Sequence, residues 1–155
     1  MPRASVNGIE LEYELQQATP AKARGETIVL IMGLGCQLLH WPDPFVRALV
    51  REGYDVLRFD NRDVGLSTHF DHLKPQPATK LDMARWLIGA KLKSHYTLND
   101  MVLDTLGLMD ELSIEAAHIV GCSMGGMIAQ LLAIHHPQRA LSLTSVMSTS
   151  GNRRV

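Results

Sequence analysis

Short apolar runs alternate with amphipathic stretches along most of the 155-residue chain. The run 27–31 is almost entirely apolar, which is typical of a strand buried on both faces of a parallel sheet. Segments 54–59 and 116–120 also have strand character, and the apolar residues of 43–52 and 98–112 recur between them at helical spacing. Because strands and helices alternate in this way, the pattern predicts an α/β fold with a mostly parallel sheet.

The two ends of the chain add further elements to this pattern. Near the N-terminus, Asn7-Gly8 separates two strand-like segments, a pair that suits the tight turn of an antiparallel hairpin. The second of these segments, 9–15, alternates apolar and acidic residues, so one of its faces is expected to be solvated. Helices are predicted over 81–93 and 124–136, and a last strand over 140–147.

Composition and charge narrow the class of protein. With 46% hydrophobic and 20% charged residues, the chain is expected to form one globular domain rather than a disordered segment. A formal net charge of −1 indicates no surface for nucleic acid or an anionic membrane. Cys36 and Cys122 lack metal-site spacing and are expected to be free thiols. No apolar signal segment begins the chain, so a cytoplasmic location is expected.

The chemistry of the sequence centres on Gly121-Cys122-Ser123-Met124-Gly125, a G-x-S-x-G pattern between a predicted strand and a predicted helix. A nucleophilic serine in such an elbow occupies a strained turn, which requires glycine two residues before it and two after it. The N-terminus of the following helix supplies N–H donors for a developing oxyanion. A plain glycine-rich turn with an unreactive serine is the alternative, and the strand and helix on either side favour the catalytic interpretation.

With this elbow the sequence resembles the α/β-hydrolase family, and the resemblance covers most of the chain. The segment 32–35, Met-Gly-Leu-Gly, stands where the family places its oxyanion loop, with Met32 in place of the usual His. The resemblance implies that the backbone N–H groups of Leu34 and Met124 form the oxyanion hole. The glycines of the two motifs are expected to have structural roles: Gly33, Gly35, Gly121 and Gly125.

A second loop supports the resemblance. The segment 60–67, Asp-Asn-Arg-Asp-Val-Gly-Leu-Ser, resembles the family's D-x-R-G-x-G-x-S loop, with Asp63 where glycine is usual. We expect Asp60 and Arg62 to fix this loop by charge-assisted hydrogen bonds.

A serine nucleophile selects acyl transfer among the reactions of the family, which leaves esters, thioesters, amides and certain carbon–carbon bonds next to a carbonyl. The resemblance is closest to small-molecule esterases, including methyl esterases, although lactonases and thioesterases share these motifs. Carboxylic esters are therefore the expected small-molecule substrates. Neither a cofactor nor a metal is expected. His69 and His72, with Asp71 between them, lack the further ligands that a tetrahedral metal site needs.

The acid and the histidine of the family's catalytic triad are not found after Ser123. No Asp or Glu follows this serine, and His135 and His136 are roughly 16 Å or more away along the predicted helix. His40, which follows the oxyanion loop, is left open as a substitute base. The resemblance therefore implies that residues 1–155 form a single, C-terminally incomplete three-layer domain whose lid and last strands are missing. A hydroxyl without a base is a poor nucleophile, so weak activity is expected.

The predicted strand 140–147 leads to an alternative function. Without a following strand it would form an unpaired sheet edge, which can pair with a second copy of the chain or with a complementing C-terminal half. The alternative to a crippled serine hydrolase is therefore an inactive truncation or a binding module that uses this edge.

Overall fold

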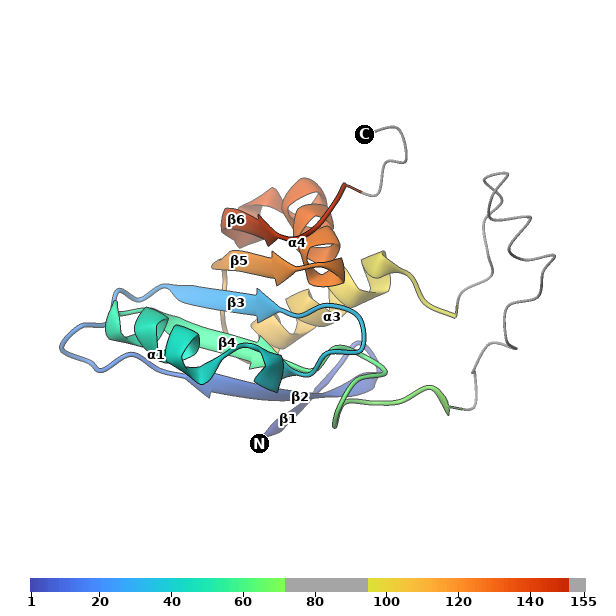
Figure 1. Cartoon of the computed structure of the whole chain (residues 1–155), viewed down its shortest axis with the longest axis horizontal. Helices are drawn as coiled ribbons and strands as arrows, with labels where there is room; N and C mark the ends of the chain where they lie inside the picture. The colour runs from blue at the N-terminus through green and yellow to red at the C-terminus, as the bar shows by residue number, and fades with distance from the viewer. Residues whose placement is uncertain (72–94, 151–155) are drawn as a thin grey trace.

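The computed structural model describes residues 1–71 and 95–150, and these residues form an α/β structure around one sheet (Figure 1). The six strands are β1 (Arg3–Val6), β2 (Ile9–Gln16), β3 (Thr27–Ile31), β4 (Asp55–Phe59), β5 (Ala117–Cys122) and β6 (Ala140–Val146). The helices are α1 (Asp43–Arg51), α3 (Leu98–Glu111) and α4 (Met124–His135), with short 3-10 helices η1 (Leu38–His40) and η3 (Pro137–Arg139). The helix predicted over 81–93 lies outside the described residues.

The sheet has the strand order β1-β2-β4-β3-β5-β6. Strands β4, β3, β5 and β6 are parallel neighbours, whereas β1 pairs antiparallel with β2 and β2 antiparallel with β4. Asn7 and Gly8 connect β1 to β2 with φ angles of 49° and 77°, the left-handed conformation that the tight hairpin turn requires. The predicted α/β fold with a mostly parallel sheet and an N-terminal hairpin is therefore confirmed.

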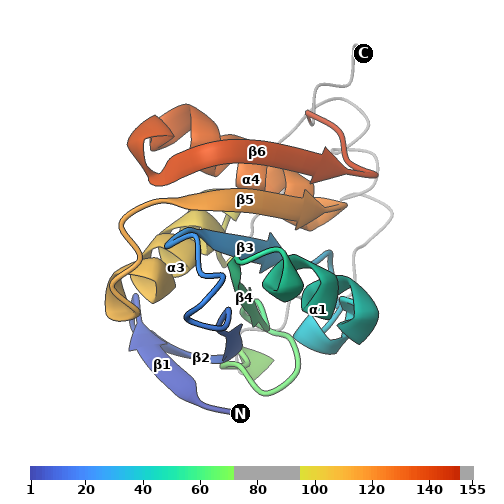
Figure 2. The same ribbon diagram turned by 90° about the vertical axis from the view of Figure 1, so that its left-hand side faces the viewer.

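Helices cover both faces of this sheet and make three layers (Figure 2). On one face α1 contributes to a small core, whose buried residues are Ile28, Leu30, Met32, Trp41, Val46 and Val56. On the other face α3 and α4 pack over a larger core that also includes the hairpin. Within β3, Ile28 and Leu30 belong to the small core while Val29 and Ile31 belong to the large one. The expectation that this strand is buried on both faces is correct.

One expectation about β2 is wrong. Glu10 is exposed, but the next two acidic residues are not part of a solvated face: Glu12 is only 2% exposed and Glu14 is half-buried. Glu12 accepts a hydrogen bond from the Nε of Arg3 at 3.1 Å, and Glu14 pairs with the buried Arg58 of β4. The reason is the strand order: β2 lies inside the sheet, so its acidic side chains meet cations from neighbouring strands instead of water.

No described helix is both long and apolar enough to span a bilayer. The apolar stretch near residue 120, which has the length of a span, is divided between β5 and α4, as the glycines at its centre predict. Cys36 and Cys122 are free thiols.

Candidate active site

Ser123 forms a strained turn between β5 and α4. Its φ of 55° and ψ of −119° lie in a region that non-glycine residues rarely occupy, at a typical cost of about 1–3 kcal/mol. The surrounding backbone holds this conformation: Ser123 donates its N–H to Val146 at 2.9 Å, and its carbonyl accepts from the N–H of Gly126 at 2.9 Å. Ser148 adds a hydroxyl bond to the same carbonyl at 2.7 Å. The Ser123 side chain is exposed at the top of this turn.

The glycines around Ser123 are required for steric reasons. A Cβ at Gly121 would overlap the carbonyl of Gly125, and a Cβ at Gly125 would overlap the carbonyl of Ile31 on the neighbouring strand. A Cβ at Gly126 would approach the Ser148 side chain to 2.5 Å. The elbow can therefore form only where β5, β3 and α4 meet without these methyl groups.

The loop after β3 lies against the elbow. A Cβ on Gly33 would be 3.2 Å from Ser123 Cβ and 3.6 Å from its Oγ, so the loop backbone passes directly beside the nucleophile candidate. Gly35 has a φ of 67°, a conformation that favours glycine, although its Cβ would meet open space. The turn, loop and cap hydrogen bonds of the described residues use neither the N–H of Leu34 nor that of Met124. Both groups are free to donate to a bound oxyanion.

Asp60 connects the loop 60–67 to η1. Its carboxylate accepts the N–H of Leu38 at 2.7 Å and the N–H of Leu66 at 3.1 Å, and its carbonyl accepts the Ser67 hydroxyl at 2.6 Å. Gly65 lies so close to Asp60 that a Cβ there would overlap the carboxylate. Asp60 therefore orders the loop from a buried position, away from the reacting atoms.

Arg62 makes a buried ion pair with Asp104 of α3. Its Nε and Nη2 donate to the two carboxylate oxygens at 2.6 Å each, and Asn7 of the hairpin turn adds a hydrogen bond to Asp104 at 2.8 Å. Burial alone would lower the pKa of Arg62, but the hydrogen bonds and charge of Asp104 raise it above the ordinary value. The ion pair joins three segments that are far apart in sequence.

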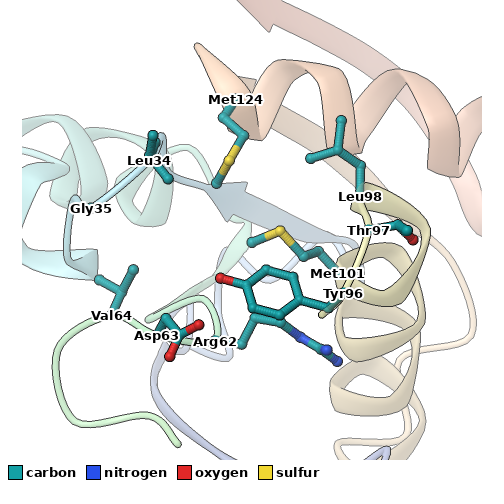
Figure 3. Close-up of a pocket in the computed structure, with 10 residues that line it drawn as sticks. All are labelled: Leu34, Gly35, Arg62, Asp63, Val64, Tyr96, Thr97, Leu98, Met101 and Met124. Carbon is teal, nitrogen blue, oxygen red and sulfur yellow. The ribbon is translucent and has the colours of Figure 1, made fainter. Parts of the chain in front are cut away.

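A pocket of about 320 Å³ lies beside these elements (Figure 3). Its lining combines the oxyanion loop, the loop 60–67 and the start of α3 and α4: Leu34, Gly35, Arg62, Asp63, Val64, Tyr96, Thr97, Leu98, Met101 and Met124. The structure thus brings Leu34 and Met124, predicted from the two motifs, to one cavity. Ser123 is not a lining residue, but it precedes Met124 in the chain and is itself exposed.

Sequence reasoning missed the polar part of this pocket. Tyr96 hydrogen-bonds to Asp63, and burial together with that bond and the Asp63 charge raises the pKa of Tyr96 to about 12. Asp63 has a φ of 61°, so an aspartate occupies a left-handed position where the family usually has glycine. The sequence shows that aspartate replaces glycine at this position, but it does not predict the contact with Tyr96.

No described histidine is hydrogen-bonded to Ser123. Three of them have other partners: His40 bonds to Gln37, His69 to the carbonyl of Gly65, and His118 to Ser142 and Glu26. His118 is half-buried, with 24% of its side chain exposed. Within residues 1–71 and 95–150 no cluster of three metal-ligating side chains occurs, and His72 lies outside them.

The fold and the elbow together define a class of protein. Its members have helices on both faces of a mostly parallel sheet and a strained serine directly after a central strand. The sequence model of the alpha/beta hydrolase fold matches residues 26–153. The chain belongs to the α/β-hydrolase family.

Several of the relatives and solved structures that match the chain have the names of hydrolases. It is 34% identical to rhodomycin D methylesterase DauP from Streptomyces sp. (strain C5), over 77% of this chain and 34% of that protein. It is 29% identical to the putative carbamate hydrolase RutD from Variovorax paradoxus (strain S110), over 90% of this chain and 43% of that protein. The enol-lactonase from Burkholderia xenovorans LB400 superimposes with a TM-score of 0.66 at 34% identity, over 90% of this chain and 44% of that one.

The chain spans less than half of the length of each of these three relatives, between 34% and 44%. The matched part contains the elbow, the oxyanion loop and the loop 60–67. Membership of a hydrolase family follows from this match.

Proposed function

We propose that the chain carries the nucleophile and oxyanion elements of a serine hydrolase that acts on carboxylic esters. In this proposal Ser123 attacks the acyl carbon, the ester C–O bond breaks, and the N–H groups of Leu34 and Met124 stabilise the negative charge on the carbonyl oxygen. The acyl group is then bound to Ser123 until water releases it as a carboxylic acid. The alcohol is the first product, and it leaves with the proton that the Ser123 hydroxyl has lost.

One observation supports this proposal above the others: Ser123 is an exposed serine in a strained elbow whose neighbouring glycines have no room for a Cβ. Strain of this kind is retained at functional positions, where it holds a side chain in its reactive direction. The loop beside Ser123 supports acyl transfer, and the methylesterase among the relatives favours esters as the acyl compounds.

The proposal includes an incomplete triad. Since no described histidine contacts Ser123, the residues that the structure describes supply no general base to accept its proton. Oxyanion donors and binding alone can leave a residual acceleration of roughly 10³ to 10⁴ over water. We therefore expect slow acylation of Ser123 and little turnover in the 155-residue chain.

Hydrolysis of a short p-nitrophenyl ester by the purified chain tests this function, with Ser123→Ala as the variant and Cys122→Ala as the control for the neighbouring thiol. We expect slow p-nitrophenol release approaching one equivalent, an acyl adduct on Ser123 in the intact mass, and loss of both in Ser123→Ala only. Equal release by the wild type and Ser123→Ala, in folded samples, would contradict the proposal. Rapid multiple turnover would instead show that a base lies within the chain.

A second candidate function, strand pairing, is favoured by β6. Among the described strands β6 pairs only with β5, and Leu141 and Leu143 on it are 51% and 42% exposed. Such an edge offers N–H and C=O groups to another strand, from a second copy or from a complementing C-terminal half. Light scattering over a concentration series tests self-association. Leu143→Lys should reduce it, whereas Ile134→Lys, an exposed site on α4, should not.

A further inference from the structure

The pocket beside Ser123 is apolar except at one end. Five of its lining side chains are aliphatic or thioether groups: Leu34, Val64, Leu98, Met101 and Met124. Opposite them, Figure 3 shows the Tyr96 hydroxyl pointing toward the carboxylate of Asp63. A cavity of this kind, largely apolar with a few placed polar groups, is typical of a small-molecule site in which the polar groups set orientation.

Two other polar side chains of the pocket have partners of their own. The guanidinium of Arg62 donates to Asp104 through two nitrogens, at 2.6 Å each. The hydroxyl of Thr97 bonds to Asp100 at 2.8 Å, as part of the cap of α3. Among the described lining residues Asp63 carries the one carboxylate, so it offers a charged acceptor to a ligand hydroxyl.

Asp63 is held in place on several sides. Its carboxylate accepts the N–H of Phe70 at 2.6 Å and is hydrogen-bonded to Tyr96. The guanidinium of Arg62 lies 5.1 Å from the centre of the Tyr96 ring and 5.7 Å from that of Phe70, and the two rings are 5.9 Å apart. Because these contacts are made without a ligand, binding would require little rearrangement of the pair.

The Asp63 carboxylate can accept a further hydrogen bond. An ionised carboxylate has about four acceptor positions, and the known partners of Asp63 occupy two of them. Asp63 and Tyr96 are both half-buried, so the free positions are reachable from the pocket.

We infer that Asp63 and Tyr96 form a specificity-determining pair, which selects apolar ester substrates that carry a hydroxyl group. The substrate hydroxyl donates to Asp63, while its apolar body lies against the aliphatic wall. This inference rests on the proposed ester-hydrolase function, because it concerns the substrate of the same site. It gives a role to the aspartate that replaces the usual glycine of the loop.

Two probes test the inference: methyl phenylacetate and methyl 4-hydroxyphenylacetate. Their dissociation constants are measured at pH 7 by ligand-observed NMR, on the 155-residue chain with Ser123→Ala so that no probe is consumed. A hydrogen bond to a charged group predicts about tenfold tighter binding of the hydroxylated probe than of the unsubstituted one.

Asp63→Asn, in the same background, is the decisive variant. Asparagine tolerates the left-handed conformation and retains an oxygen for the Phe70 N–H, but it lacks the charge. We expect it to reduce the tenfold preference to about twofold or less, and Tyr96→Phe to reduce it in part. Glu111→Gln removes an exposed carboxylate at the far end of α3 and should leave the preference unchanged.

Two results would overturn the inference. One is equal binding of the hydroxylated and unsubstituted probes to folded chain. The other is an equal loss of affinity for both probes in Asp63→Asn, because that would indicate a structural role only. Since binding is measured without Ser123, a preserved preference together with absent ester hydrolysis would refute the proposed function and not the selectivity of the pocket.

Discussion

Gly125 shows how one missing side chain permits the elbow. Its backbone lies against the carbonyl groups of Ile31 and Met32, where a methyl group would overlap backbone atoms that cannot move freely. Gly125→Ala is therefore expected to lower the free energy of unfolding by about 2 kcal/mol or more, measured by urea denaturation. Gly107→Ala in α3 is the matched control. Its Cβ would lie 3.1 Å from the Cβ of Val6, a contact that a shift of a few tenths of an ångström relieves, and the gain in helix propensity offsets the crowding.

Gly107→Ala shows whether the loss of stability is specific to the elbow. Equal losses of stability for Gly125→Ala and Gly107→Ala would show that the elbow can relax around a methyl group, contrary to the steric argument. A large loss confined to Gly125→Ala would agree with it.

At the scale of single residues, the elbow was predictable because its spacing is local. Gly121, Ser123 and Gly125 lie within five residues, and each is required by the same turn. The pair Asp63 and Tyr96 was not predictable, because the two residues are distant in sequence and meet only when α3 packs beside the loop. Patterns within a short stretch of sequence do not predict such a contact.

The start of α3 is an element whose stability depends on pH. Thr97 and Asp100 form a capping box: the Thr97 N–H donates to the Asp100 carboxylate at 2.7 Å, and the Thr97 hydroxyl accepts from the Asp100 N–H at 3.4 Å. The hydrogen bonds from Thr97 hold the pKa of Asp100 below its ordinary value of 3.8. A lowered pKa stabilises the fold above the unfolded-state value, and this contribution is lost as pH falls through the folded-state value.

Asp100→Asn is accordingly expected to destabilise the chain by about 0.5–1 kcal/mol at pH 7, as measured by urea denaturation. The difference in stability between variant and wild type should shrink below pH 3.8, where the wild-type carboxyl becomes protonated and is then as neutral as the asparagine amide. Asn99→Asp, at the exposed neighbouring position, controls for a general effect of charge in the first turn. A difference that is constant from pH 7 to pH 2.5 would contradict the assignment to the cap.

Strand and helix positions agree closely with the sequence pattern, whereas the pairing of the strands does not follow from it. Strand β3 begins and ends where the apolar run does, since its burial on both faces leaves no choice of residue type. The antiparallel contact of β2 with β4 does not follow from the pattern, and it explains the wrong prediction for Glu14, which pairs with Arg58 of β4. Glu12 pairs instead with Arg3 of β1. Alternating residues indicate two faces of a strand, but they do not reveal what covers each face.

At the scale of the molecule, the sheet connects two cores, one on each of its faces, and no described helix contributes to both. Side chains of β3 alternate between them: Ile28 and Leu30 enter the small core, Val29 and Ile31 the large one. Strand β4 does the same, with Val56 on one face and Leu57 on the other. Loss of either core would therefore expose one face of strands that are needed by the other.

This sharing predicts a single unfolding transition for the part of the chain that the structure describes. Trp41 is 7% exposed in the small core, so its fluorescence reports on that face, whereas α3 and α4 over the large core dominate far-ultraviolet circular dichroism. In a Trp86→Phe background, which leaves Trp41 as the remaining tryptophan, the two signals should give the same urea midpoint. Val46→Ala, which removes methyl groups from the small core only, should shift both midpoints together by an amount typical of a small cavity, about 1–2 kcal/mol. If the fluorescence midpoint moved while the circular dichroism midpoint remained in place, the cores would be independent and the alternation along β3 and β4 would not couple them.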